Sequence, residues 1–253
     1  MFTALLLALW STFCIFDTLG PTLIYAGRPL IAGTVAGLIV GDPTLGMALG
    51  GTLELTALGV YTYGGASIPD YPTGAIVGTA LATSATGTLS SHLALGLGIG
   101  LPAAILLASI DPVGRFLPTF WIHRADVFAA EGRSHALTWT HWTAFIPWGL
   151  VRFIPTFVAV YAGRSVVQDF QNAIPAGFVS GMSLVGAMLP AVGFAMLLRI
   201  MPVKRYWYML LIGFVLFAYL QVPMQGIAIF GVAVAAMFMA LRSRQTTQEA
   251  THA

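Results

Sequence analysis

Most of the chain consists of long, uninterrupted apolar runs. Residues 1–10, 93–107 and 227–241 contain almost no polar side chain. The strands of a membrane barrel would instead alternate apolar and polar residues. We therefore predict an all-α, polytopic membrane protein with several transmembrane helices. The segments that approach the roughly 20 apolar residues of a transmembrane helix are residues 93–110, 142–162, 174–198, 206–222 and 223–241.

The N-terminal half contains shorter apolar segments. Residues 30–40, 47–60 and 73–83 are rich in Gly, Ala and Thr. At about 1.5 Å per residue they are too short to cross a hydrocarbon core of about 30 Å. Interrupted, Gly-rich segments are typical of broken or re-entrant helices that line a substrate site. Tilted helices packed through small residues are the alternative, and both descriptions can hold together.

The composition supports a membrane location and excludes several kinds of chemistry. Of 253 residues, 58% are hydrophobic and 8% are charged, whereas soluble domains carry about 25% charged residues. The net charge is only +2 and no basic run suggests a nucleic-acid partner. A single cysteine, Cys14, excludes an internal disulfide. The only lysine, Lys204, follows no phosphate-binding glycine loop, so we expect no nucleotide, cofactor or metal on this chain.

Basic residues outside the apolar segments predict the orientation. They gather in residues 111–141, 199–205 and 242–244. Two predicted spans separate each group from the next, so all three groups can lie on the cytoplasmic side of the membrane. We expect a membrane-embedded domain over residues 1–241 and a disordered cytoplasmic tail over residues 242–253. We expect residues 111–141 to form a polar loop, which could include an interfacial amphipathic helix. Arg152, inside a predicted span, should face protein or water.

Glu54 is the strongest candidate for chemistry, because a carboxylate inside an apolar, Gly-rich segment marks a functional site. Thr52 lies two residues before it. An ionised carboxylate makes strong hydrogen bonds to sugar hydroxyls. Two other roles stay open, namely a proton carrier and a structural carboxylate bonded to backbone amides. Gly50 and Gly51 would let the backbone approach a ligand.

Three further polar groups could line a site. Gly64, Gly65 and Asp70 lie in a loop with prolines, which either dips into the membrane or forms a surface turn in which Asp70 begins a helix at Thr73. Asp17 either pairs with Arg28 or is solvated at the membrane border. Asn172 lies in residues 168–175, which we expect to form a polar loop, and it either binds a ligand or helps to cap a helix.

The histidines give no sign of a metal or phosphorylation site. No two of the five stand four residues apart, so we expect them to face solvent or the membrane interface. They are His92, His123, His135, His141 and His252. We therefore expect no catalytic residue on this chain.

The motifs together resemble the IIC subunit of the mannose/fructose/sorbose-type phosphotransferase system. The resemblance covers almost the whole chain, with residues 84–139 less distinctive. The residues that carry it are Arg28-Pro29-Leu30-Ile31, Gly41-Asp42, Gly50-Gly51-Thr52-Leu53-Glu54-Leu55, Gly64-Gly65-Ala66, Pro69-Asp70 and Asn172-Ala173-Ile174-Pro175.

This resemblance implies a function and partners. Such subunits pair with a IID subunit in the bacterial cytoplasmic membrane, where both form a multi-pass sugar-conducting complex, expected as a trimer of IIC–IID heterodimers. Soluble IIA and IIB proteins relay phosphate from phosphoenolpyruvate, and IIB phosphorylates the sugar as it is delivered. No phosphotransfer residue is then needed here.

We therefore expect a permease subunit that carries a hexose or hexose derivative. Mannose, glucose, fructose, sorbose, N-acetylgalactosamine and galactosamine are all compatible substrates. The rival hypotheses are a proton-coupled secondary sugar transporter, with Glu54 as proton carrier, and a structural scaffold for a partner channel. The residues expected to contact the sugar are Glu54, Thr52, Asp70, Gly64, Gly65, Asp17 and Asn172.

Overall fold

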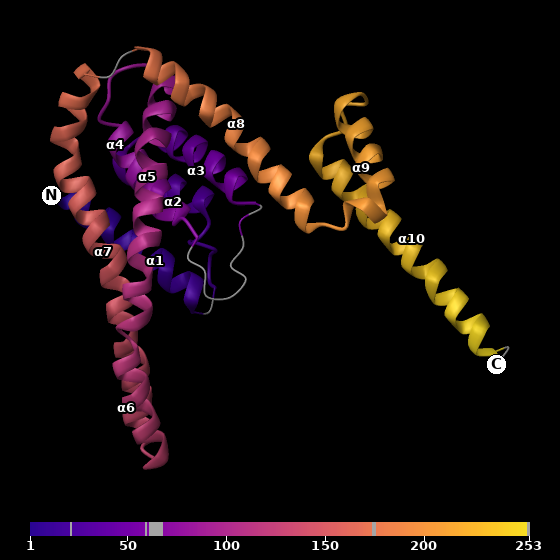
Figure 1. The fold of residues 1–253 in the computed structure, drawn as a ribbon, viewed down its shortest axis with the longest axis horizontal. Coiled ribbons are helices and arrows are strands. Elements are labelled where there is room, and N and C mark those ends of the chain that lie inside the picture. Colours follow the sequence, from indigo (N-terminus) through magenta and orange to yellow (C-terminus); the bar gives the residue numbers. More distant parts are fainter. Residues whose placement is uncertain (21, 59, 61–67, 174–175, 252–253) are drawn as a thin grey trace. The chain divides into compact units, whose positions relative to one another are not determined.

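The computed structural model describes residues 1–20, 22–58, 60, 68–173 and 176–251, and all regular structure within these ranges is helical (Figure 1). This confirms the predicted all-α class. The helices are α1 (Phe2–Leu19), α2 (Pro29–Val40), α3 (Pro43–Ala57), α4 (Tyr71–Ala82), α5 (Leu89–Phe116), α6 (Thr119–Ala130), α7 (Ser134–Ala173), α8 (Ala176–Ile200), α9 (Val203–Ala218) and α10 (Met224–Thr251).

The chain forms two compact units, Met1–Leu197 and Leu198–Ala253. Among the described residues, three helical stretches are long and apolar enough to cross a membrane: Phe2–Leu19, Leu89–Ala130 and Ser134–Gly163. In the second unit, α9 and α10 border an apolar cavity of about 410 Å³. Helix α10 runs to Thr251 and so includes most of the tail predicted over residues 242–253. The boundary between a membrane domain and a tail at residue 241 stays a prediction.

Glycines let the helices of the first unit approach closely. Helix α2 packs against α3, and α4 packs against α5 (Figure 1). A Cβ added to Gly33 would lie 2.6 Å from the carbonyl oxygen of Gly46, and one added to Gly74 would lie 2.6 Å from that of Gly100. Any larger side chain would push these backbones apart, so small residues set both interfaces.

Helix α4 lies in the centre of this unit. It contacts α2, α3, α5 and α7, and all of its residues except Pro72 are buried. Asp70 caps its N-terminus by accepting a hydrogen bond from the amide of Thr73, 3.1 Å away, and Pro72 occupies the first turn. Asp42 and Pro43 begin α3 in the same way. These caps satisfy amides that have no partner within the helix.

The short helices α2, α3 and α4 fall where the sequence predicts short apolar segments. Whether they enter the membrane as re-entrant helices stays a prediction. Two polar segments differ from expectation. Residues 111–116 continue α5, and residues 168–173 continue α7. In the first case Arg115 neutralises Asp111 one helical turn away, which makes a charged turn compatible with a continuous helix.

Candidate functional site

A cavity of about 450 Å³ opens in the first unit, where the end of α1, the start of α4, and the helices α5 and α7 converge. This volume is in the range of small-molecule sites. Aromatic side chains of Tyr25, Tyr71 and Trp148 line it. Its described charged residues balance one another, and they are Asp17, Asp70, Asp111, Arg28, Arg115 and Arg152.

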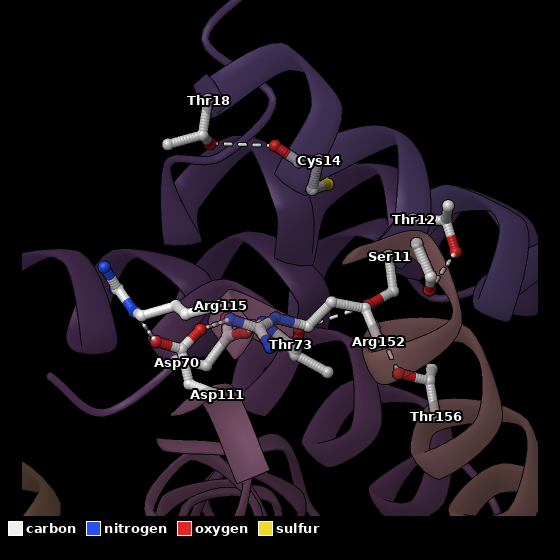
Figure 2. Close-up of polar contacts among 11 residues, drawn as sticks. Ser11, Thr12, Cys14, Thr18, Asp70, Thr73, Asp111, Arg115, Arg152 and Thr156 are labelled. Atoms are coloured by element: carbon white, nitrogen blue, oxygen red, sulfur yellow. Dashed lines mark hydrogen bonds and ion pairs between the residues drawn. The ribbon is translucent and has the colours of Figure 1, made fainter. Parts of the chain in front are cut away.

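Arg152 joins two carboxylates inside this site (Figure 2). Only 5% of the residue is exposed. Its Nε pairs with Oδ2 of Asp70, and its Nη2 lies 2.8 Å from Oδ1 of Asp111. A buried guanidinium requires such partners because leaving water is costly for a charge. The expectation that Arg152 faces protein or water is confirmed.

Asp111 extends this network along α5. Its Oδ2 accepts a hydrogen bond of 2.7 Å from Nε of Arg115, one turn later on the helix. The guanidinium of Arg115 lies over the ring of Trp148 on α7, 5.6 Å from the centroid. The charges therefore alternate from Asp70 through Arg152 and Asp111 to Arg115. Alternation lets each buried charge face an opposite one.

A chain of hydroxyl groups lies beside the ion pairs (Figure 2). Thr156 on α7 donates to Ser11 on α1 at 3.2 Å, and the hydroxyls of Ser11 and Thr73 are 3.1 Å apart. Ser11, Thr73 and Arg152 also border a small cavity of about 30 Å³. Three helices thus meet at the first turn of α4 through polar contacts.

Asp17 is buried at the end of α1, with 3% of the residue exposed. Its carboxylate accepts backbone hydrogen bonds from Leu23, Ile24 and Ala26, the shortest being 2.7 Å. The suggested pair with Arg28 does not form, and the alternative of a solvated charge is wrong as well. Asp17 instead orders the connection between α1 and α2 because three amides converge on it.

Glu54 connects α3 with the start of α2. Its Oε1 lies 3.3 Å from Nη1 of Arg28, and its Oε2 accepts a hydrogen bond of 3.4 Å from the amide of Leu30. Thr52 donates to the carbonyl of Ala48 in its own helix. Neither Glu54 nor Thr52 is among the described residues that line the 450 Å³ cavity, whereas Arg28 is.

The other predicted contacts are only partly placed. Gly64 and Gly65 lie outside the described residues, and so does the side chain of Asn172. Gly50 packs against α2, since an added Cβ would lie 2.5 Å from the carbonyl oxygen of Pro29. No three potential metal-ligating side chains gather among the described residues.

Sequence reasoning missed Asp111 and Arg115 as members of the site. Two signals could have identified them. A lone arginine in an apolar span, here Arg152, requires a buried acidic partner. Asp111 and Arg115 also stand at the i, i+4 spacing of a helical ion pair. The polar composition of residues 111–141 instead suggested a loop.

Comparisons with known proteins agree on one family. Residues 1–237 match the family model described as "PTS system sorbose-specific IIC component". The fructose permease IIC component of Bacillus subtilis (strain 168) is 32% identical over 233 residues, covering 89% of this chain and 82% of the relative.

Two solved structures share the fold. A chain titled "Structure of membrane protein" has a TM-score of 0.80 and 26% identity, over 95% of this chain and 96% of that one. A chain from the cryo-EM complex of the mannose transporter ManYZ with microcin E492 has a TM-score of 0.56 and 27% identity, over 94% and 95% of the two chains.

Proposed function

The chain belongs to the family of PTS system sorbose-specific IIC components, and on this premise we propose that it binds a hexose or hexose derivative in the 450 Å³ cavity. It is a sugar permease component of the phosphotransferase system and a multi-pass protein of the inner membrane. The observation that carries the proposal is the convergence of buried carboxylates, guanidinium groups and aromatic rings on one cavity.

The lining suits an uncharged polyhydroxylated ligand. Carboxylates accept, and guanidinium groups donate, strong hydrogen bonds to hydroxyl groups. The aromatic rings of Tyr25, Tyr71 and Trp148 offer apolar surface to the carbon face of a sugar ring. Because the described charges of the lining balance, the cavity need not be filled by an ion. Asp70 and Asp17 are the carboxylates that we assign to sugar contacts.

Glu54 is not among the described lining residues, and it acts on this cavity through Arg28. Its carboxylate holds the Arg28 guanidinium, which lines the cavity. Thr52 lies one turn from Thr56, whose hydroxyl donates to the Thr52 carbonyl at 2.8 Å. We keep Thr52, Gly64, Gly65 and Asn172 as proposed contacts that substitution would test.

The proposed partners are a IID membrane subunit and the phosphocarriers IIA and IIB. As a permease component, the chain works with other components of its system. IIB phosphohistidine would phosphorylate the sugar on delivery, and the assembly would be a trimer of IIC–IID heterodimers. Helices α9 and α10 expose large apolar residues such as Trp207, Phe214 and Phe230. Such a surface suits contacts with lipid or with a partner helix.

Binding of a labelled hexose to the purified IIC–IID complex tests the cavity. Asp70→Asn keeps the size of the side chain but removes its charge. A charge-assisted hydrogen bond contributes about 1.5–3 kcal/mol, and a loss of about 1.4 kcal/mol is tenfold in affinity. We expect the dissociation constant to rise about tenfold. Wild-type affinity in an intact Asp70→Asn complex would remove Asp70 from the sugar site.

A further inference from the structure

We propose that Arg152 is a positioning residue for sugar binding, which fixes the Asp70 carboxylate at the cavity wall without being the main sugar contact. This inference rests on the proposed function, because it presumes that Asp70 binds the sugar. Arg152 lies on α7, far from Asp70 in sequence, and its guanidinium contacts a carboxylate on each of two sides.

The Asp70 carboxylate is anchored at both oxygens. Oδ1 accepts the hydrogen bond from the Thr73 amide at 3.1 Å, and Oδ2 pairs with Nε of Arg152. The backbone amide of Asp70 also donates to the carbonyl of Ala104 on α5, 3.0 Å away. A carboxylate has about four lone-pair sites, so these anchors fix its plane and leave acceptor sites for sugar hydroxyls.

Arg152 is itself fixed by Asp111. The two Asp residues contact different nitrogen atoms of the guanidinium, Nε and Nη2. The planar guanidinium can bridge two carboxylates in a defined direction, whereas the point charge of a lysine cannot. Among the described residues, neither Nε nor Nη1 of Arg152 forms a hydrogen bond, so Nε holds Asp70 as an ion pair. The two N–H groups of Nη1 therefore hold neither Asp70 nor Asp111.

Arg152 and Asp70 differ in exposure, and we assign them different roles in sugar binding. Both residues line the cavity, and the Arg152 side chain is the less exposed of the two, at 6% against 11% for Asp70. Losing the Nε contact would release the Asp70 side chain without removing its charge. Since a displacement of about 1 Å can reduce the efficiency of a site by about 10²-fold, a change at Arg152 should reach the sugar through Asp70.

A double-mutant cycle on sugar affinity tests this inference. Arg152→Lys, Asp70→Asn and the double variant are compared with the wild type as purified complexes with IID. We expect Arg152→Lys to weaken binding about tenfold when Asp70 is present. In the Asp70→Asn background it should change affinity less than about twofold, because residues that act as one unit are not additive. The same factor in both backgrounds would overturn the positioning role.

The control variant is Val160→Ala on the same helix. Val160 is fully buried, at 0% exposure, and belongs to a core cluster that does not include Asp70 or Arg152. Any effect of this change on sugar affinity should therefore be equal in both backgrounds. If the effect of Val160→Ala on sugar affinity disappears in the Asp70→Asn background, then any weakening of α7 packing acts through Asp70. That result would overturn the inference.

A second variant decides the case if Arg152→Lys prevents assembly. Asp111→Asn keeps Arg152 and its contact with Asp70 but weakens the second anchor of the guanidinium. We expect about threefold weaker binding with Asp70 present and no change in the Asp70→Asn background. Equal effects in both backgrounds would reject the inference. Wild-type affinity of Asp70→Asn alone would instead remove Asp70 from the proposed sugar site, so the two failures are distinguishable.

Discussion

Arg152 on α7 and Asp111 on α5 form a buried ion pair across 41 residues of sequence, with 2.8 Å between Nη2 and Oδ1. Both side chains are only 6% exposed. A charge of this kind is stable only beside its partner, because water is not available to solvate it. The pair therefore fixes the separation of two long helices at the level of the candidate site.

Removing one member of this pair should destabilise the protein strongly. Asp111→Ala leaves the buried guanidinium with Asp70 alone. Breaking a buried pair typically costs about 3–5 kcal/mol, and we expect a clear fall in the thermal unfolding midpoint of the purified complex. The control is Glu131→Ala, which breaks an exposed pair with Arg133 and should cost at most about 1 kcal/mol. Equal effects would contradict a buried network.

Glycine packing between α4 and α5 predicts a second stability effect. In Gly100→Ala the new Cβ would lie 2.6 Å from the carbonyl oxygen of Gly74. The backbones would have to separate, and overpacking of this kind costs about 1–3 kcal/mol. Gly213→Ala on α9 is the control, because no described atom outside the adjacent turns of its own helix backbone lies within 4 Å of its added Cβ. Thermal unfolding of both variants measures the difference, and an unchanged midpoint in Gly100→Ala would speak against close packing.

Glu54→Gln should weaken sugar binding while the complex still assembles. The change removes the charge that faces Arg28 at 3.3 Å but keeps the size of the side chain. Losing about 1.4 kcal/mol is tenfold in affinity, and we expect binding to fall by about an order of magnitude. Subunit stoichiometry is measured in parallel. Collapse of the complex would indicate that Glu54 is structural, and unchanged affinity would remove it from the site.

The partner requirement can be measured independently of sugar. We expect this chain alone to be unstable or inactive, because its many exposed apolar side chains on α9 and α10 suit contacts with another membrane subunit. Size-exclusion chromatography of the chain expressed with and without IID makes the comparison. A monodisperse, sugar-binding protein obtained without IID would argue against an obligate pair.

The sequence predicts the helical class and the short N-terminal helices well, because continuous apolar runs and their lengths report directly on helices in lipid. It also identifies Asp70 as a candidate site residue and Arg152 as a charge that should face protein or water. It does not predict that they meet, since Asp70 and Arg152 lie on different elements and only tertiary packing joins them. Polar composition misled the prediction at Asp111, where neutralisation by Arg115 and Arg152 allows the helix to continue.

Asp17 and Glu54 show the same limit. The sequence predicts each as a charge at or near a site. It does not predict their partners, because these include backbone amides that only the folded chain brings close to the carboxylates. Asp17 meets the amides of the connection after α1, and Glu54 meets Arg28 and the amide of Leu30. The pairing of Arg28 with Glu54 rather than Asp17 follows from the close approach of α2 and α3 at Gly50.

The fate of a labelled hexose tests most directly whether this chain passes a sugar to the phosphotransferase relay. Membrane vesicles containing the chain and IID are loaded with phosphoenolpyruvate and the relay proteins, and the internal label is analysed. We predict that it accumulates as sugar phosphate, and that omitting IIB stops accumulation. Accumulation of free sugar without IIB, abolished by a protonophore, would contradict this account and favour proton-coupled transport.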